Sequence, residues 1–118
     1  MHILVVDDEP AIGQLLASYL SRNGHTVKSA ETGEAALELI AEPFDLAVVD
    51  FSLPDMNGME VATEYLERTS ARVILASGYD IGMDLVPAAF RPRVRSIRKP
   101  FMPRAILAAF ADTLSELS

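Results

Sequence analysis

The chain has 118 residues, of which half are hydrophobic and 23% are charged, a balance typical of a chain that buries a core. Its length predicts a single domain over residues 1–118. Cysteine is absent, which excludes disulfides, thiolate metal sites and cysteine nucleophiles. The formal net charge of -7 argues against direct binding of nucleic acid, because a phosphate backbone needs a basic surface.

The hydrophobic patterning also bears on the compartment. Acids interrupt the apolar start of the chain early, and the basic region that opens a signal peptide is missing. No apolar run approaches the roughly 20 residues that span a bilayer. We therefore expect a soluble, cytoplasmic protein without membrane insertion.

The chain opens with a pattern that predicts a strand and then a helix. Residues 3–6 are continuously apolar, as in strands that are covered on both faces. Apolar side chains then recur at the spacing of one helix face, with Pro10 near the start and Gly24 as a stop, which predicts a helix over about residues 9–23. Residues 26–30 form a weaker strand candidate, and the lysine within it suits a sheet edge.

The middle of the chain repeats this alternation. Residues 33–41 are rich in Ala, Glu and Leu and predict a second helix that ends before Pro43. An apolar run at residues 46–49 predicts the third strand. Residues 58–68 predict the third helix, and residues 73–76 predict the fourth strand.

The pattern is weakest after the fourth strand. One glycine at position 82 and two prolines lie within residues 79–93, so any helix there is expected to be short, distorted or partly melted. Residues 94–98 predict a last strand, and Pro103 opens a final helix. The side chains of that helix expected to face the core are Leu107, Phe110, Leu114 and Leu117.

Strand and helix alternating five times prescribe an α/β fold, a parallel sheet with right-handed crossovers and helices on both faces. We predict a flavodoxin-like, doubly wound, five-stranded sheet of order 2-1-3-4-5, because this order places the first and third strands side by side at the switch point. Acids and one lysine follow these strands at once, and they should meet at one edge of the sheet: Asp7, Asp8, Asp50 and Lys99. Carboxylates and an ammonium gathered there predict a site for a divalent cation and a phosphoryl group.

These residues resemble the receiver domains of two-component response regulators. The family pattern is an acidic pair after the first strand, an aspartate after the third followed by x3-Pro-x3-Gly, a Ser or Thr after the fourth, and Lys-Pro after the fifth. The chain supplies every part in order along its whole length: Asp7-Asp8, Asp50 with Pro54 and Gly58, Ser77-Gly78, and Lys99-Pro100.

The resemblance implies that Asp50 is the phosphoacceptor, since a carboxylate can form an acyl phosphate. It also implies a Mg²⁺ cofactor bound directly by Asp8 and Asp50, with the backbone carbonyl of Ser52 as a third protein ligand and Asp7 acting through water. A structural alternative stays open for the acidic pair, because Asp7 or Asp8 could cap the first helix.

The remaining motif residues also receive roles from the resemblance. Lys99 and Ser77 would contact phosphoryl oxygens, and Lys99 would pair with Asp50 when no phosphate is present. The peptide bond from Lys99 to the following proline is expected to be cis. Ser52 and Tyr79 flank the path of the attacking water in the family, and we expect the Tyr79 ring to shield this path and lengthen the phosphorylated lifetime.

The chain departs from the family pattern in its fifth strand. Many members carry an aromatic three residues before the lysine, and the rotation of this ring accompanies the movement of the residue equivalent to Ser77. Here that switch position is Ser96. We hypothesise that the signal instead travels through residues 80–92, since a segment of low local stability can serve as a two-state element.

Basic residues gather near the end of the chain. Six of the ten Lys and Arg residues lie within residues 91–104. They could be solvated side chains that balance an acidic chain. Alternatively, the face of the fourth helix, fifth strand and fifth helix, which docks partners in the family, is unusually basic here and favours an acidic partner.

The pattern indicates a signalling module, a monomer or weak dimer, which takes part in its own phosphorylation and dephosphorylation without being an enzyme. A histidine kinase or a histidine phosphotransfer protein would donate the phosphoryl group to Asp50, and a downstream protein would read the changed surface.

A magnesium-dependent phosphatase is disfavoured, because it needs a second acid where Ser52 stands. A flavin site is disfavoured, because the acids after the first strand repel its phosphate.

The more serious alternative is a pseudo-receiver, which acts as a phosphorylation-independent interaction module. Such a protein is expected to lack the acceptor, a cation ligand or the lysine. The chain retains Asp50, Asp8 and Lys99.

Overall fold

The computed structural model describes residues 1–110, which form a parallel sheet with helices on both faces. The strands lie in the order β2-β1-β3-β4-β5, and every neighbouring pair is parallel. This confirms the flavodoxin-like α/β fold expected from the sequence. The strands are β1 (His2–Val6), β2 (Thr26–Ala30), β3 (Leu46–Asp50), β4 (Arg72–Ser77) and β5 (Val94–Arg98).

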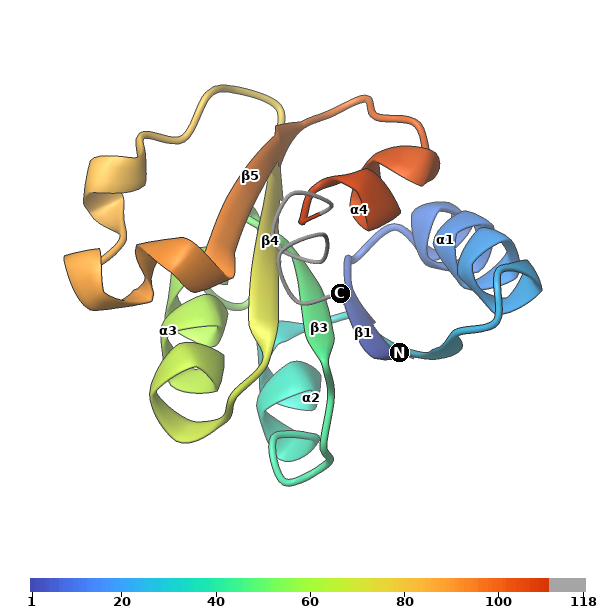
Figure 1. Ribbon diagram of the computed structural model, residues 1–118, viewed down its shortest axis with the longest axis horizontal. Helices are drawn as coiled ribbons and strands as arrows, with labels where there is room; N and C mark the ends of the chain where they lie inside the picture. The colour runs from blue at the N-terminus through green and yellow to red at the C-terminus, as the bar shows by residue number, and fades with distance from the viewer. Residues whose placement is uncertain (111–118) are drawn as a thin grey trace.

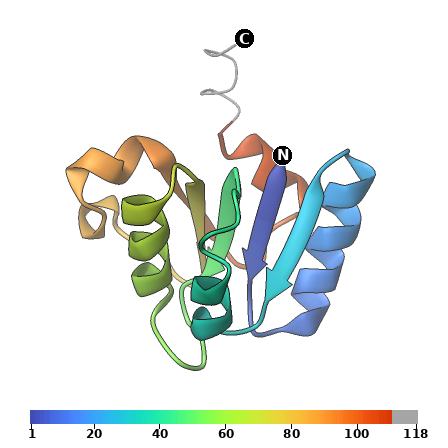
Figure 2. The ribbon, with the colours of Figure 1, turned by 90° about the horizontal axis from the view of Figure 1, so that it is seen from below.

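The helices form two layers, one on each side of the sheet (Figure 1, Figure 2). Those of the described residues are α1 (Pro10–Arg22), α2 (Gly33–Glu38), α3 (Gly58–Arg68) and α4 (Arg104–Ala108), with two 3₁₀ turns, η1 (Met83–Leu85) and η2 (Ala88–Arg93). The longest, α1, has 13 residues, and no helix within residues 1–110 has the length and apolar character that crossing a membrane requires.

The two helix layers explain why the central strands are apolar without alternation. Leu4 and Val6 of β1 point into the core beneath α2 and α3, while Ile3 and Val5 pack beneath α1 and α4. All four side chains are at most 1% exposed. The edge strand β2 is mostly exposed, as its polar composition predicts.

Two predicted helices differ from the observed ones. The second was expected over residues 33–41, but α2 ends at Glu38. Beyond this point Leu39 and Ile40 donate to carbonyls three residues back, a tightened turn that leads the chain toward Pro43 and β3.

The final helix was predicted to face the core with Leu107, Phe110, Leu114 and Leu117. Phe110 is buried and Leu107 is partly buried against the same core, whereas Leu114 and Leu117 lie outside the described residues. Ile106 of α4, which the prediction omitted, is buried. It belongs to the same core as Phe110, four residues further on.

The segment between β4 and β5 lacks a regular helix and is held by arginine side chains. Arg93 donates to the carbonyl oxygens of Leu66 (3.0 Å), Thr69 (2.8 Å) and Ala71 (2.8 and 3.2 Å), at and after the end of α3. These bonds satisfy carbonyls that the helix end leaves without partners. Arg91 donates through Nε to carbonyls of η1 and the residue that follows it, those of Met83 and Val86.

Arg95, in β5, lies over the ring of Phe110 with its guanidinium carbon 4.7 Å from the ring centroid. The arginines at positions 91, 93 and 95 therefore contact backbone and aromatic groups of the chain itself. The interpretation that they are merely solvated side chains is wrong for these three.

Candidate functional site

The strand order brings the polar residues at the strand ends together. Val6 of β1 lies opposite Val49 of β3, so Asp7 and Asp50 follow neighbouring strands at the same level. Asp50 and Asp7 are each 7% exposed. Ser77 ends β4 and is 3% exposed, and its carbonyl accepts from the N–H of Lys99 at 2.7 Å.

Lys99 connects two of the acids. Its Nζ lies 3.0 Å from Oδ2 of Asp7 and 3.3 Å from Oδ2 of Asp50. The sequence predicted the pairing with Asp50, and the structure adds Asp7 as the nearer partner. Burial by itself lowers the pKa of Lys99, but the two carboxylates outweigh burial and raise that pKa above its ordinary value. The Lys99–Pro100 peptide bond is cis, as expected.

Asp50 is a carboxylate in an unfavourable environment. Burial raises its pKa above the ordinary value, and the Asp7 carboxylate acts in the same direction. The N–H of Ser52, which donates to Asp50 Oδ1 at 3.1 Å, and the ammonium of Lys99 only partly offset this. A bound cation would relieve the cost of ionising Asp50 here.

The acid cluster fits a divalent cation. Asp7, Asp8 and Asp50 each offer one carboxylate oxygen, and these three oxygens lie within 4.8 Å of one another. Asp8 is exposed, so the cluster opens to solvent on that side. A few carboxylate oxygens with water access are the donor set that Mg²⁺ prefers.

Neither acid of the pair occupies the capping position of α1. Glu9 stands there without a side-chain capping bond, and Pro10 begins the helix. Asp7 instead accepts from the N–H of Glu9 through Oδ1 at 2.9 Å, which leaves its Oδ2 for Lys99. The alternative that the pair merely caps the helix is therefore wrong in its detail, although Asp7 does fix the backbone just before α1.

The loop after Asp50 has a steric reason for its glycine. A Cβ atom on Gly58 would lie 2.1 Å from the carbonyl oxygen of Asp50, a distance that no side chain can occupy. The N–H of Gly58 donates to the carbonyl of Phe51 at 2.7 Å. The spacing between Asp50 and Gly58 in the family pattern thus closes a tight loop back onto the strand end.

Ser77 and Tyr79 lie beside this loop. The N–H of Tyr79 donates to Ser77 Oγ at 3.2 Å. The Tyr79 side chain is 55% exposed, and its ring meets the ring of Phe51 edge-on with 5.9 Å between centroids. Tyr79 is therefore placed between the segment after β4 and the loop after Asp50, while Ser52 is exposed in that loop.

Ser96 lies in β5 opposite Leu75 of β4 and is exposed. Ser96 shares one face of β5 with Val94, which belongs to the core beneath α2 and α3. Ile81 and Val86, in the segment between β4 and β5, belong to the same core, so Ser96 and this segment lie on the same side of the sheet. No ring stands at the position where the family pattern has its rotating aromatic.

Sequence reasoning missed Asp55. Its carboxylate accepts from the N–H groups of Glu34 (2.9 Å) and Gly33 (2.8 Å) at the start of α2, and these bonds lower the pKa of Asp55. The loop after Asp50 is thereby tied to a second helix. The partners are about twenty residues away along the chain, so no local pattern could have indicated this contact.

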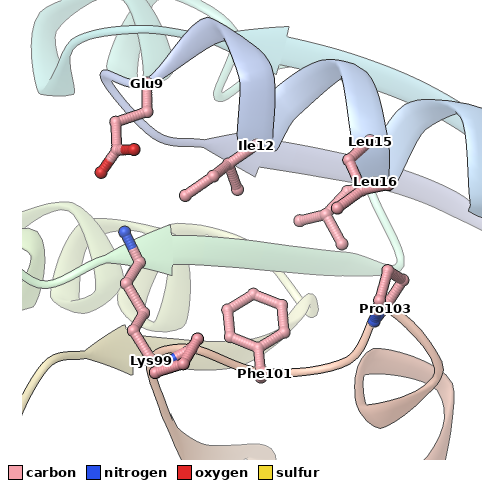
Figure 3. A pocket seen from close by; sticks show the side chains of 8 residues that line it. Glu9, Ile12, Leu15, Leu16, Lys99, Phe101 and Pro103 are labelled. Carbon is pink, nitrogen blue, oxygen red and sulfur yellow. The ribbon is translucent and has the colours of Figure 1, made fainter.

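Sequence reasoning also missed a cavity of about 420 Å³ that adjoins the site. It lies between α1 and the loop from β5 to α4, and its walls are largely apolar (Figure 3). Lys99 lines it as well as the acid cluster, so the cavity and the cluster share a side chain. The apolar side chains that line it include Ile12, Leu15, Leu16, Phe101 and Pro103.

Comparison with known proteins agrees with this arrangement. The family model of the response regulator receiver domain matches residues 3–111 of the sequence, and the chain belongs to this family. Receiver domains are the aspartate-phosphorylated modules of two-component systems, and they bind Mg²⁺ at their acidic pocket.

Two curated relatives show the extent of the similarity. The TorCAD operon transcriptional regulatory protein TorR of Escherichia coli is 34% identical over 114 residues, which are 96% of this chain and 50% of TorR. The regulatory protein VanR of Enterococcus faecium is 32% identical over 107 residues, 90% of this chain and 46% of VanR. The chain thus spans about half the length of these relatives.

Solved structures share the fold. A CheY-like receiver domain protein from Methanospirillum hungatei superposes with a TM-score of 0.83 at 32% identity, covering 98% of this chain and 94% of that one. A response regulator from Burkholderia pseudomallei, solved with a phosphorylated aspartic acid, a calcium ion and citrate, gives a TM-score of 0.81 at 28% identity, covering 99% of this chain and 72% of that one.

Proposed function

We propose that this chain accepts a phosphoryl group on Asp50 in a Mg²⁺-dependent reaction and thereby switches a surface that binds a partner protein. The observation that carries the proposal is the bridge from Lys99 to Asp7 and Asp50 within the acid cluster. It gathers a nucleophilic carboxylate, cation ligands and a phosphoryl-binding ammonium at one sheet edge.

The chemistry assigned to Asp50 is nucleophilic attack. A carboxylate oxygen forms a bond to phosphorus while the bond from phosphorus to a histidine nitrogen of the donor breaks, and the released imidazole takes up a proton from solvent. Lys99 and Ser77 donate hydrogen bonds to the phosphoryl oxygens. The Lys99 ammonium, which pairs with carboxylates before the transfer, then pairs with the phosphoryl group.

The same residues would hold the cation. Asp8 and Asp50 would ligate Mg²⁺ directly, the Ser52 carbonyl would be a third ligand, and Asp7 would act through water. When bound, the ion neutralises charge on the carboxylates and on the transferring group. The support for this assignment is the cluster of three carboxylate oxygens and the raised pKa of Asp50.

The donor is a histidine kinase or a histidine phosphotransfer protein. Such a donor must bring its phosphohistidine to Asp50 from the solvent side of the cluster. The apolar cavity beside Lys99, flanked by Leu15, which is 54% exposed, offers a surface for docking next to the acceptor (Figure 3).

The output surface lies on β5 and on the elements beside it, which are residues 79–93 and α4. With Ser96 at the position of the family aromatic, the change at Asp50 passes through residues 80–92, whose 3₁₀ turns are held by few side-chain bonds. Hydrogen exchange on this segment with and without a phosphoryl mimic tests this route, and identical protection would contradict it.

The decisive experiment for Asp50 is incubation with a small acyl-phosphate donor and Mg²⁺, followed by intact-mass measurement. The protein should gain the mass of one phosphoryl group, and Asp50→Asn should not. A gain that persists in Asp50→Asn would place the phosphate elsewhere. If neither the small donor nor a phosphorylated phosphotransfer protein modifies the chain, the pseudo-receiver alternative holds.

A further inference from the structure

A groove lies between α2 and α3, away from the strand-end site. Figure 2 shows these helices side by side on one face of the sheet. Two hollows of about 490 and 500 Å³ form the groove, and they meet at Leu37 and Met56. Met59 and Thr63 of α3 continue its floor.

The floor of the groove is apolar and rich in methionine. Met56 and Met59 are partly buried against the core, and Leu37 is half-buried, so each leaves part of its surface in the groove. Met56 fits tightly against the start of α2, since a Cβ atom on Gly33 would lie 2.4 Å from its Cγ. Flexible, polarisable methionine side chains adapt to the side chains of a partner, which makes them common on peptide-binding surfaces.

The rim of the groove is acidic. Among residues 1–110, no Lys or Arg lines either hollow, and the carboxylates that line them are Glu34, Glu38, Asp55, Glu60 and Glu64.

The rim carboxylates differ in their engagement. Asp55 is occupied by the start of α2, and Glu64 pairs with Arg68 at 3.2 Å. Within residues 1–110, Glu34, Glu38 and Glu60 form no ion pair, and all three are exposed. An apolar floor between uncompensated carboxylates attracts a ligand with an apolar face and cationic flanks.

We infer that this groove is the docking site for a basic amphipathic α-helix of a partner protein. One face of that helix would place apolar side chains on Met56, Met59 and Leu37, and flanking Lys or Arg side chains would pair with Glu38 and Glu60. The 11 residues of α3 extend about 16 Å, which matches about three turns of a partner helix. This inference does not depend on the phosphorylation of Asp50.

The probe for this site is a fluorescent 14-residue peptide of leucine and lysine, with leucines on one helix face. Binding to the full chain is followed by fluorescence anisotropy. The amphipathic peptide should bind at least tenfold more tightly than a peptide of the same composition with its leucines dispersed, and tenfold more tightly than a version with glutamate in place of lysine. Equal affinity for the peptide with dispersed leucines would show that charge alone drives binding, and it would overturn the inference.

Two double variants of equal charge change locate the site. Glu38→Lys with Glu60→Lys should weaken binding of the amphipathic peptide at least tenfold. Glu67→Lys with Asp84→Lys, at exposed positions that line neither hollow, should change it less than twofold. Equal weakening by both pairs would overturn the inference, because it would show a response to net charge alone.

Amide chemical-shift changes on peptide addition should centre on residues 34–38 and 56–64. Changes centred on Asp7 and Asp8, or on the cavity beside α1, would place the peptide elsewhere and contradict the proposal.

Sedimentation of the free chain provides one further outcome. A dimer that Glu38→Lys with Glu60→Lys dissolves would make a second copy the occupant and would also overturn it.

Discussion

The strand-end site and the segment between β4 and β5 are neighbours that are held in place by different means. Asp50 and Ser77 stand at the ends of strands whose backbone ladders fix their positions. Residues 79–93 form two 3₁₀ turns, and their main polar attachments are the guanidinium groups of Arg91 and Arg93. The proposed chemistry therefore rests on the rigid sheet, while the position of the adjacent segment depends on a few side chains.

The largest effect is expected when the ammonium of the rigid site is removed. Lys99→Met should lower the rate of phosphorylation by an acyl-phosphate donor about 100-fold, because the transferring group loses a preorganised cationic partner. Lys28→Met removes the same charge from the exposed edge strand β2, where the lysine pairs with Glu42. This control should phosphorylate like the unmodified protein, and a similar loss in both variants would show that net charge, not position, sets the rate.

The irregular segment should respond most strongly to loss of Arg93. Arg93→Ala leaves the carbonyls of Leu66, Thr69 and Ala71 without their donor and should lower the free energy of unfolding by about 2–3 kcal/mol. The matched control is Arg98→Ala. Arg98 is exposed and lies 3.7 Å from Asp80, so its loss should cost less than about 0.5 kcal/mol.

Urea titration measures both values. If Arg93→Ala and Arg98→Ala destabilise equally, the arginine bonds do not hold the segment, and the contrast between the two regions fails.

The same contrast decides what could be predicted from the sequence. The site residues follow buried strands, and a buried parallel strand shows itself as an apolar run that ends at a polar residue. Once the strand order is inferred, the meeting of Asp7, Asp50 and Lys99 follows from geometry. The rule needs only local patterns and one topological choice, so it predicted the fold and the members of the acid cluster.

The parts that escaped prediction depend on side chains that reach distant backbone. Arg93 bonds to a carbonyl 27 residues earlier in the chain, and Asp55 bonds to N–H groups more than twenty residues earlier. Neither contact leaves a periodic signal. The early end of α2 and the burial of Ile106 are similar, since both depend on how a helix meets the sheet and not on its own composition.

A smaller effect concerns the stability of the rigid site itself. Asp50→Asn should raise the free energy of unfolding at pH 7, without Mg²⁺, because burial makes the ionised carboxylate unfavourable. The pKa of Asp50 is raised on folding, so the folded protein holds this proton more tightly than the unfolded chain. The difference between variant and unmodified protein should therefore shrink as the pH falls through the folded pKa toward 3.8.

Thermal unfolding at pH 7 and at pH 4.5 tests the sign. Added Mg²⁺ should stabilise the unmodified protein more than the variant, because the ion binds the folded cluster by mass action. A variant that is less stable than the unmodified protein at pH 7 would show that Asp50 is not strained by burial.

The smallest expected effect concerns Tyr79, which connects the two regions through its ring contact with Phe51. Tyr79→Ala should shorten the lifetime of the phosphorylated protein a few-fold, which corresponds to less than about 1 kcal/mol in the barrier, because water gains access beside Ser52. Tyr79→Phe keeps the ring and should keep the lifetime. The measurement is the decay of phosphorylated mass after the donor is removed. An unchanged or longer lifetime in Tyr79→Ala would show that the ring, which is 55% exposed, does not cover the path of the water, and that the irregular segment influences the site by another route.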